Sequence, residues 1–405
     1  MNIKRHIPKF VFRCWHFSLA FLGAFIYGFP SKKMKVIGIT GTNGKSTTAT
    51  ICFNILKEAG HRVASVSSIS FKIGEKEETN DLKMTMPGRM KIQKFLKDAL
   101  KEKCEYVIVE VTSEGIRQFR HKFIDFDIAI FTNLSKEHIE SHGSFENYRA
   151  AKGEFFNQVK GVHILNKDDL QFEYFNSFNA RKKITYSMDN PSDVQADDVC
   201  VSHEGSKFKI LGEEFKTKLL GKFNVYNCLA AIAFAQNEGI YKEHIKEGIL
   251  KTEGVRGRME KVIYEPFSFY IDYAFTPSAL EQVYQYLKPD IAILGACGGG
   301  RDRWKRPILG ALAEKYAKTV IVTNEDPYDE DPEKIIDEVL AGAPNGIKIL
   351  DRREAIRRAL EMAKPGDVII STGKGSETCI ACKRGKREKW DEREVILEEF
   401  KKLNK

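Results

Sequence analysis

The run GITGTNGKSTTAT, residues 38–50, carries the clearest chemical pattern in the chain. A glycine-rich turn followed by Lys45 and Ser46 is typical of loops that hold nucleotide phosphates. Backbone N–H groups of the turn would face the phosphates, Lys45 would reach the β and γ phosphates, and the Ser46 hydroxyl would bind magnesium. The residues expected to bind ATP here are Gly41, Thr42, Asn43, Gly44, Lys45, Ser46 and Thr47.

Such a loop needs a strand before it and a helix after it. Residues 34–40 alternate β-branched and small side chains as a buried strand does, and residues 46–59 form a helical pattern that ends at Gly60. A glycine-rich turn before a helix is often only a turn, and Ile39 stands where the strict phosphate-loop pattern has glycine. The Lys-Ser pair in the required place nevertheless favours phosphate binding.

The rest of the chain predicts an α/β fold in two large domains. With 405 residues, of which 42% are hydrophobic, the chain can bury sizeable cores. Residues 34–190 alternate strands and helices, including strands at 105–111 and 126–133, which favours a mostly parallel sheet. Residues 194–220 read as a small antiparallel side sheet.

A second series of strands alternates with helices after residue 267 and predicts a Rossmann-like, doubly wound C-terminal domain. Its strands are expected at 269–274, 291–297, 320–323, 347–350 and 368–371. We therefore expect a basic aromatic segment over 1–33, a central phosphate-loop ATPase domain over 34–255 and the C-terminal domain over 256–405.

The first 35 residues hold seven Lys and Arg side chains and no acid, around an aromatic run at 10–29 that Arg13 and His16 interrupt. The uninterrupted apolar stretch, 17–29, is short for a membrane span. A helix lying in the headgroup plane of an anionic leaflet suits this pattern best. A tilted span and a helix packed on protein remain open, whereas a signal peptide and nucleic-acid binding fit poorly.

The eight cysteines lack the paired spacings of a zinc site or a disulfide scaffold. Cys379 and Cys382 form a CxxC without a second pair, so we expect reduced cytosolic thiols and no zinc. Together with the basic aromatic segment, this favours a cytoplasmic protein that is peripheral on the inner face of the membrane.

Further strings make the sequence resemble the Mur ligase family, most of all its MurE-like branch, from residue 34 to the C-terminus. They are GTNGKSTT at Gly41, VEVTSEGIRQFR at Val109, FTNLSKEHIESHGSFENYRAAKGEFF at Phe131, LLGKFNVYNCLAA at Leu219, GRME at Gly257, IDYAFTPSAL at Ile271, GACGGGRDRWKRP at Gly295, DRREAI at Asp351 and GKGSE at Gly373. The resemblance implies an ATP-dependent amide ligase of peptidoglycan precursor synthesis, which joins an amino acid to a UDP-MurNAc-peptide carboxylate through an acyl phosphate.

The resemblance also implies roles for individual residues. One magnesium ion would lie on Ser46 and Glu110, and a second on His138 and a carbamylated Lys152. Lys45, Glu110, His138 and Lys152 would thus serve catalysis. Without the resemblance, Lys152 and His138 would be read as ordinary surface residues.

Further nucleotide and substrate residues follow from the same resemblance. The nucleotide would also meet Asn224, Asn227, Arg258, Asp272, Arg301 and Asp351. The acceptor carboxylate would be held by Thr85, Ser113 and Arg120, whose fork-shaped guanidinium suits a carboxylate or phosphate. The incoming amino acid would meet Asp326, Tyr328, Gly375 and Glu377.

Three departures from the family pattern bear on the substrate. The basic aromatic segment stands where the family has a UDP-binding domain, which favours a differently held or lipid-linked acceptor. Tyr328 replaces the arginine of the DNPR motif found in diaminopimelate-adding enzymes, so that amino acid is disfavoured. Phe275 and Glu114 replace two histidines, while every predicted metal ligand is retained.

Two other functions remain open on the sequence. The first is another amide ligase of the superfamily, either similar to folylpolyglutamate synthase or a maker of polyamino acids. The second is a membrane-associated ATP-binding scaffold without turnover, which the intact set of predicted metal ligands disfavours.

Overall fold

The structure is a computed structural model that describes residues 9–403, with side chains from residue 11. Its residues cluster into two compact units. Unit 1 holds the described residues up to Leu134 together with Glu146–Glu253, and unit 2 holds Ser135–Phe145 and the described residues from Gly254 onward. Of the predicted basic N-terminal segment, Lys4 and Arg5 lie outside the described residues.

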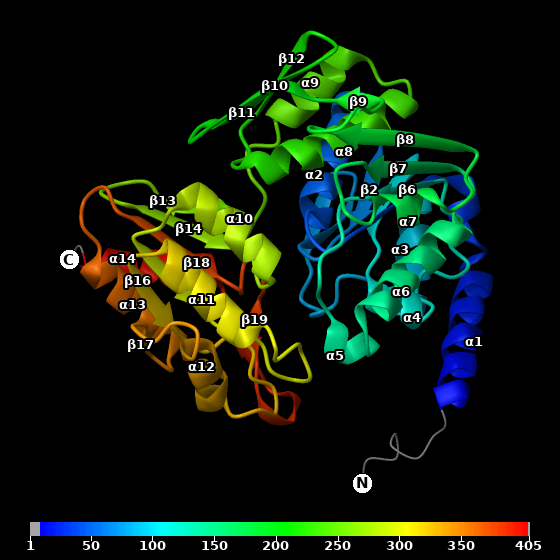
Figure 1. Cartoon of the computed structure of the whole chain (residues 1–405). Helices are drawn as coiled ribbons and strands as arrows, with labels where there is room; N and C mark the ends of the chain where they lie inside the picture. Colours follow the sequence, from blue (N-terminus) through cyan, green and yellow to red (C-terminus); the bar gives the residue numbers. More distant parts are fainter. Residues whose placement is uncertain (1–8, 404–405) are drawn as a thin grey trace. The chain divides into compact units, whose positions relative to one another are not determined.

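Unit 1 is built on one large sheet (Figure 1). Its helices are α1 (Lys9–Tyr27), η2 (Pro30–Lys33), α2 (Lys45–Glu58), α3 (Arg89–Lys101), α4 (Ser113–Arg117), α6 (Phe145–Gln158), α7 (Phe172–Asn176), α8 (Lys222–Asn237) and α9 (Lys242–Leu250). The first residue of α6, Phe145, is assigned to unit 2 and the rest of that helix to unit 1. Its strands are β1 (Lys35–Thr40), β2 (Val63–Val66), β3 (Ser70–Ile73), β4 (Lys76–Thr79), β5 (Tyr106–Glu110), β6 (Ile128–Phe131), β7 (Val162–Asn166), β8 (Lys182–Ser187), β9 (Val194–Gln195), β10 (Asp197–Ser202), β11 (Gly205–Ile210) and β12 (Glu213–Thr217).

Within the described residues the large sheet has the strand order β4-β3-β2-β5-β1-β6-β7-β8-β9. All neighbouring pairs from β2 to β9 are parallel, while β3 and β4 form an antiparallel edge. β10, β11 and β12 form a separate antiparallel sheet. The expected mostly parallel sheet with a small antiparallel side sheet is therefore confirmed.

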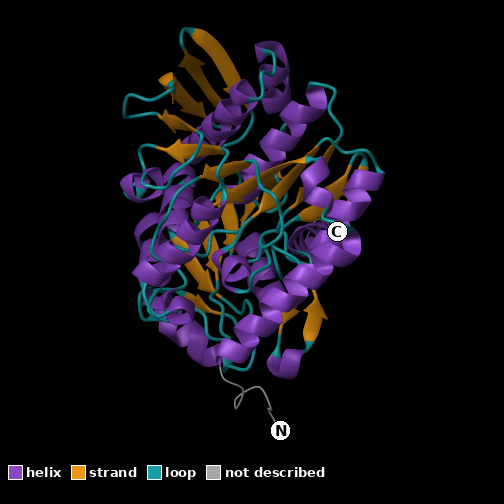
Figure 2. Cartoon of the chain, turned by 90° about the vertical axis from the view of Figure 1, so that its right-hand side faces the viewer, coloured by secondary structure: helices purple, strands orange, loops and turns teal. Residues whose placement is uncertain are grey.

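The central strand β1 is buried on both faces, because Val36, Ile37 and Ile39 are inaccessible to solvent. Helices lie on both sides of the strands, as Figure 2 shows, and this explains why β1 is apolar between Lys35, which is exposed, and Thr40. Gly38 lets α6 come close: a Cβ atom at this position would lie 2.2 Å from the ring of Phe155. The close approach matters because α6 also carries Lys152.

Helix α1 packs one face against α3. Small side chains allow the contact: Ala20 and Ala24 are buried, and a Cβ on Gly23 would meet the sulfur of Met90 at 3.1 Å. The rest of the helix surface exposes large apolar side chains, namely Val11, Trp15, Phe17, Phe21, Leu22, Phe25 and Ile26. No helix in the described part of the chain combines the length and apolarity that a bilayer crossing requires.

Unit 2 contains a second, smaller sheet. Its helices are α5 (Ile139–His142), α10 (Pro277–Leu287), α11 (Arg306–Tyr316), α12 (Pro332–Leu340), α13 (Arg352–Met362), η3 (Lys383–Gly385) and α14 (Glu392–Leu403). Its strands are β13 (Glu260–Ile263), β14 (Ser268–Asp272), β15 (Ile291–Leu294), β16 (Thr319–Val322), β17 (Ile347–Lys348), β18 (Val368–Thr372), β19 (Cys379–Ala381) and β20 (Arg387–Lys389).

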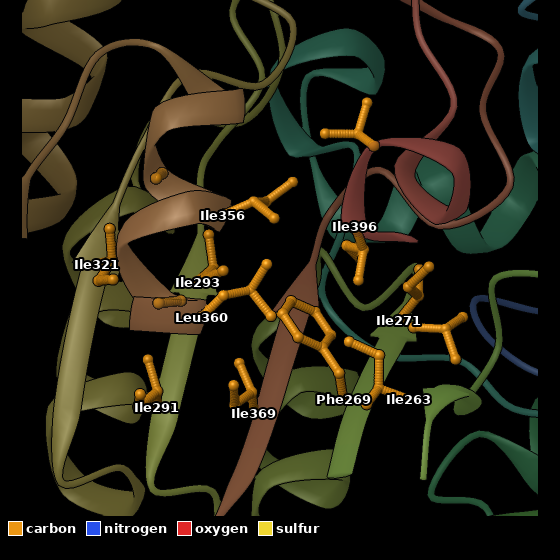
Figure 3. Packing of buried hydrophobic residues seen from close by; sticks show 14 of the residues in the cluster. Ile263, Phe269, Ile271, Ile291, Ile293, Ile321, Ile356, Leu360, Ile369 and Ile396 are labelled. Atoms are coloured by element: carbon orange, nitrogen blue, oxygen red, sulfur yellow. The ribbon is translucent and has the colours of Figure 1, made fainter. Parts of the chain in front are cut away.

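The sheet of unit 2 has the order β13-β14-β18-β15-β16-β17 among the described residues, and only β13 runs antiparallel. Its apolar side chains meet α13 and α14 in a continuous core around Phe269, Ile293 and Ile369 (Figure 3). The predicted doubly wound domain is confirmed. The predicted edge strand over 347–350 is shorter, since β17 pairs with β16 through two residues only.

Candidate active site

The phosphate loop joins β1 to α2, as the sequence predicts. Gly44 adopts a positive φ of 82°, and a Cβ there would lie 2.3 Å from Oδ1 of Asn227. Only glycine fits this position without strain. The Lys45 ammonium donates to the carbonyl oxygens of Gly41 (3.0 Å) and Thr42 (2.7 Å), so it lies over the loop that would hold the phosphates.

Lys152 lies beneath the same loop. Its Nζ donates to Gly41 O at 2.9 Å and to Thr40 Oγ1 at 3.3 Å, and the residue is 2% exposed. Both partners are neutral oxygens. Burial, and then the charge of nearby Lys45, lower the pKa of the Lys152 ammonium well below its ordinary value. A buried lysine of this kind can exist as a neutral amine, which is the form that reacts with electrophiles.

Ser46 and Glu110 are linked through a residue that the sequence did not single out. The Ser46 and Ser68 hydroxyl oxygens lie 2.8 Å apart, and the Ser68 N–H donates to Oε1 of the buried Glu110 at 3.0 Å. No group of three or more His, Cys, Asp or Glu side chains suited to a metal occurs in the described part of the chain. The oxygen atoms gathered here suit a hard cation that phosphate oxygens would help to bind.

The two asparagines predicted beside the nucleotide lie together on α8 and are buried. Asn227 Nδ2 donates to Asn224 Oδ1 at 2.8 Å, and Asn227 Oδ1 accepts from the Thr48 hydroxyl at 3.2 Å. Asn224 Nδ2 in turn donates to Leu220 O at 2.7 Å. The network fixes the start of α8 against the start of α2, next to the phosphate loop.

The predicted acceptor residues surround α4. Ser113 is buried at the first position of this helix, and Arg120, which is 9% exposed, follows its end. Arg120 Nη1 donates to Met86 O at 2.5 Å, which places its guanidinium beside the residue that follows Thr85. Unit 1 thus holds Thr85, Ser113 and Arg120 in one region, while the substituted Glu114 is exposed.

The segment around His138 belongs to unit 2 although it interrupts the sequence of unit 1. His138 has a positive φ of 58° and precedes α5. The segment is held by a buried ion pair, with Lys305 Nζ 2.6 Å from Glu137 Oε1, and by the Glu140 N–H, which donates to Asp302 at 2.8 Å. The partners belong to the loop that contains Arg301.

Two of the predicted nucleotide residues of unit 2 lie near each other in the fold: Asp272 ends β14, and Arg258 comes two residues before β13, the strand paired with β14. Asp272 is buried and accepts from the Met259 N–H (2.7 Å) and the Ala274 N–H (2.6 Å); burial raises its pKa to about 6. The Arg258 guanidinium lies 4.4 Å from the ring centre of Tyr273. Asp351 lies elsewhere: its carboxylate caps α13 by accepting the Glu354 N–H, which gives it an evident structural role.

The predicted amino-acid site contains more charged groups than the sequence suggested. Lys374 Nζ, inaccessible to solvent, lies 3.0 Å from Asp326 Oδ1 and 2.7 Å from Glu377 Oε2. Glu325 is buried beside this pair of acids, and its Oε2 has no hydrogen-bond partner. Burial, followed by the charge of Asp326, raises the pKa of the Glu325 carboxyl.

Backbone conformation shapes this site as well. Gly375 has a φ of 50°, and a Cβ there would lie 2.7 Å from Tyr273 Cβ. The ring of Tyr328 lies 5.9 Å from the Arg301 guanidinium. The sequence prediction missed Ser68, Glu325 and Lys374. Nothing in the local sequence marks Ser68, whereas Glu325 lies in the string EDPY and Lys374 in GKGSE, which were the available signals.

Comparison with known proteins identifies the family of the chain. The model of the Mur ligase middle domain matches residues 39–235, and the model named "Mur ligase, glutamate ligase domain" matches residues 257–375. A UDP-N-acetylmuramoyl-L-alanyl-D-glutamate--2,6-diaminopimelate ligase from Syntrophomonas wolfei subsp. wolfei is 37% identical over 399 residues, which cover 94% of this chain and 81% of that protein.

Solved structures give the same result. A structure of a UDP-N-acetylmuramoyl-L-alanyl-D-glutamate--2,6-diaminopimelate ligase, 30% identical, aligns over 92% of this chain and 79% of its own with a TM-score of 0.62. Folylpolyglutamate synthase from Mycobacterium tuberculosis aligns over 88% of this chain and 92% of its own with a TM-score of 0.74, but its 17% identity shows a shared fold alone. The chain belongs to the Mur ligase family, whose members are ATP-dependent ligases that form amide bonds in peptidoglycan precursor synthesis.

Proposed function

We propose that the phosphate loop of unit 1 binds ATP with Mg²⁺ and that the enzyme transfers the γ-phosphoryl group to a carboxylate of a UDP-MurNAc-peptide-like acceptor. The observation that carries the proposal is the pair of lysines on one loop oxygen, Lys45 and Lys152 on Gly41 O. Lys45 brings positive charge to the glycine-rich turn, where it suits the phosphates. Lys152 lies beneath the same turn with its ammonium form disfavoured, so its neutral amine is available to form a carbamate.

Separate residues would bind the nucleotide and the magnesium ions. Lys45 would neutralise the β and γ phosphates, and Asn224 and Asn227 would support the nucleotide beside the loop. Ser46 and Glu110 would hold one magnesium ion and His138 and Lys152 a second, for which a carbamate on Lys152 provides anionic oxygens. Bound magnesium would add positive charge opposite the phosphate oxygens.

The reaction then follows from the chemistry of carboxylates. A carboxylate is a poor acyl donor until an oxygen becomes a good leaving group, so the acceptor oxygen takes the γ-phosphoryl group and ADP leaves. The incoming amine attacks the carbonyl carbon of this acyl phosphate, phosphate departs with the C–O bond electrons, and the amine loses a proton. Arg120, with Thr85 and Ser113, would hold the acceptor carboxylate in place.

Asp326 and Glu377 would bind the ammonium group of the incoming amino acid, with Gly375 allowing its close approach. The buried Lys374 orients both carboxylates, and this supports the assignment because it fixes two acids at one place. Arg258, Asp272, Arg301 and Asp351 are assigned to the nucleotide. Tyr328 lacks the cationic fork that would grip a distal carboxylate, so we expect an amino acid other than diaminopimelate.

We also propose that the enzyme works in the cytoplasm at the inner membrane surface. The support is α1, whose exposed apolar side chains stand next to Arg13, Lys32 and Lys33 and to no acid within the helix. An apolar face flanked by cations matches an anionic leaflet.

The deciding experiment is phosphate release from ATP and Mg²⁺ with UDP-MurNAc-dipeptide, across the twenty amino acids and diaminopimelate. We expect release with the nucleotide peptide and one amino acid, and its loss by at least about a hundredfold in Lys45→Ala. Lys160→Ala, an exposed lysine of the same unit, is the control. Release that no acceptor and amine pair stimulates would overturn the substrate assignment.

The same assay tests which amino acid the enzyme selects. Tyr328→Arg restores the missing cationic fork and is expected to raise kcat/KM for diaminopimelate relative to the native amino acid. Preference of the unaltered enzyme for diaminopimelate would contradict the proposal that Tyr328 disfavours this amino acid.

A further inference from the structure

Two arginines of unit 1, Arg89 and Arg120, both donate hydrogen bonds to Gln118. Arg89, the first residue of α3, donates from Nε to Gln118 O at 2.7 Å. Arg120 donates from Nη2 to Gln118 Oε1 at 2.7 Å and from Nη1 to Met86 O. All three acceptors are neutral oxygens, so neither guanidinium is neutralised by its hydrogen bonds.

Both side chains also keep unused donors in the interior. Arg89 Nη2 and Arg120 Nε are buried and have no hydrogen-bond partner, and Arg120 as a whole is 9% exposed. A buried charge without a counterion is unfavourable, and buried donors are nearly always satisfied. The arrangement is therefore the kind expected when a ligand completes it.

Electrostatics agree with the geometry. Burial, and then the neighbouring Arg120, lower the pKa of the Arg89 guanidinium to about 10, and burial lowers the pKa of Arg120. An arginine guanidinium stays protonated in proteins, so both side chains are cationic. The acid whose charge reaches Arg120 is Glu114, but this residue is exposed and accepts from Gln118 Nε2 at 2.6 Å.

Helix α1 borders the two arginines, in addition to α3, which carries Arg89, and the segment after α4, which carries Arg120. Burial, and then the charges of Arg89 and Arg120, lower the pKa of His16 on α1, so this ring stands within their field. Next to it, Phe17 packs against Phe119 (5.9 Å between ring centres) and Phe123 (5.1 Å). Phe17, Phe119 and Phe123 thus form an aromatic wall beside the two arginines.

We propose that Arg89 and Arg120 together bind an oxyanion of the phosphate class that belongs to the acceptor, with α1 closing the site beside it. Two guanidinium forks offer parallel donors to phosphate oxygens. Under this inference Arg120 binds the phosphate oxyanion in place of the acceptor carboxylate assigned to it above, and Thr85 and Ser113 remain for the carboxylate; Arg89 and the contribution of α1 are new. The identification of the anion as part of the acceptor rests on the proposed function.

The test is binding of phosphates to the full-length chain whose nucleotide site is saturated with Mg²⁺ and β,γ-methylene-ATP. Inorganic phosphate, UDP and decyl phosphate are titrated separately by calorimetry. We expect binding that Arg89→Gln weakens at least about tenfold, because a hydrogen bond to a charged group is lost. Lys91→Gln, the same charge change on an exposed position of α3, should leave it unchanged.

The three probes distinguish the source of the anion. Tightest binding of UDP indicates a nucleotide-linked acceptor, and tightest binding of decyl phosphate indicates a lipid-linked one whose chain meets the aromatic wall. Equal affinities of Arg89→Gln and Lys91→Gln for every probe would overturn the inference. Arg89→Lys, which keeps the charge, should retain more of the binding than Arg89→Gln, and unchanged affinity for the ATP analogue verifies folding.

The outcome is separable from that of the ligase assay, since binding needs no turnover. If phosphates bind through Arg89 but no acceptor is ligated, the substrate assignment fails and the anion site stands. If ligation proceeds and Arg89→Gln leaves the KM for the acceptor unchanged, the anion site fails and the ligase assignment stands.

Discussion

At the scale of single residues, Lys152 shows how position changes chemistry. In sequence it is one lysine of AAKGEFF on a helix, where a solvated side chain is the ordinary expectation. The structure buries it under the phosphate loop beside Lys45, where the ammonium form is disfavoured. A neutral amine can attack carbon dioxide, and the carbamate that results would be anionic.

The corresponding prediction concerns Lys152→Arg. Arginine keeps the positive charge but cannot form the carbamate, so we expect ligase activity to fall at least about a hundredfold. Lys160→Arg, just beyond the end of the same helix, should retain activity. With ¹³C-labelled bicarbonate, a carbamate signal is expected in the unaltered protein and in Lys160→Arg but not in Lys152→Arg. A signal that survives in Lys152→Arg would assign it to another lysine.

At the scale of elements, α1 has two apolar faces with different environments. One face, formed by small residues such as Ala20 and Gly23, is covered by α3. The other exposes Phe25 (65%) and Ile26 (56%). A helix that is apolar all round is normally covered all round. The exposed face therefore needs a partner, and we proposed an anionic leaflet.

We predict that the full-length protein sediments with vesicles of phosphatidylglycerol and phosphatidylcholine, and less so as salt is raised, because salt screens surface charge. The double change Phe25→Ser and Ile26→Ser should weaken this binding about tenfold or more, since two large side chains no longer enter the lipid. Leu170→Ser removes an apolar side chain that is even more exposed and lies far from α1 in sequence, and it serves as the control. Equal sedimentation of all three proteins would indicate that another protein covers α1.

At the scale of the whole molecule, the stability of unit 2 depends on a buried pair of opposite charges. Unit 2 contains a fully buried ion pair, Arg352 and Glu392, with Nη2 and Oε1 2.7 Å apart. Trp390 also donates to Glu392, at 2.6 Å. Burial alone would raise the pKa of Glu392, but the charge and hydrogen bonds of Arg352 hold it below the ordinary value.

This pair predicts the pH dependence of stability. A carboxyl whose pKa is lowered by folding stabilises the protein above the pKa of the unfolded chain, and the contribution is lost as pH falls through the folded pKa. Unit 2 should therefore unfold at lower temperature as pH drops below the ordinary glutamate value of 4.5. Glu392→Gln leaves Arg352 buried without a counterion and should cost about 3–5 kcal/mol at neutral pH.

Calorimetry of the thermal transitions tests both statements. The exposed Glu398→Gln, which removes a partner of Arg353 at the surface, should change stability by less than about 1 kcal/mol. Similar losses in both variants would mean that the buried pair contributes no more than a surface contact.

The sequence determined the family, the two kinds of sheet and the phosphate loop, because strand alternation, the loop glycines and the Lys-Ser pair act over a few neighbouring residues. Only the tertiary structure placed Ser68 between Ser46 and Glu110, and Arg89 beside Arg120, since these residues are far apart in the chain. It also assigned residues 135–145 to unit 2, through the buried pair of Glu137 and Lys305. Burial and proximity set the charge state of a side chain, and neither can be read from its neighbours in sequence.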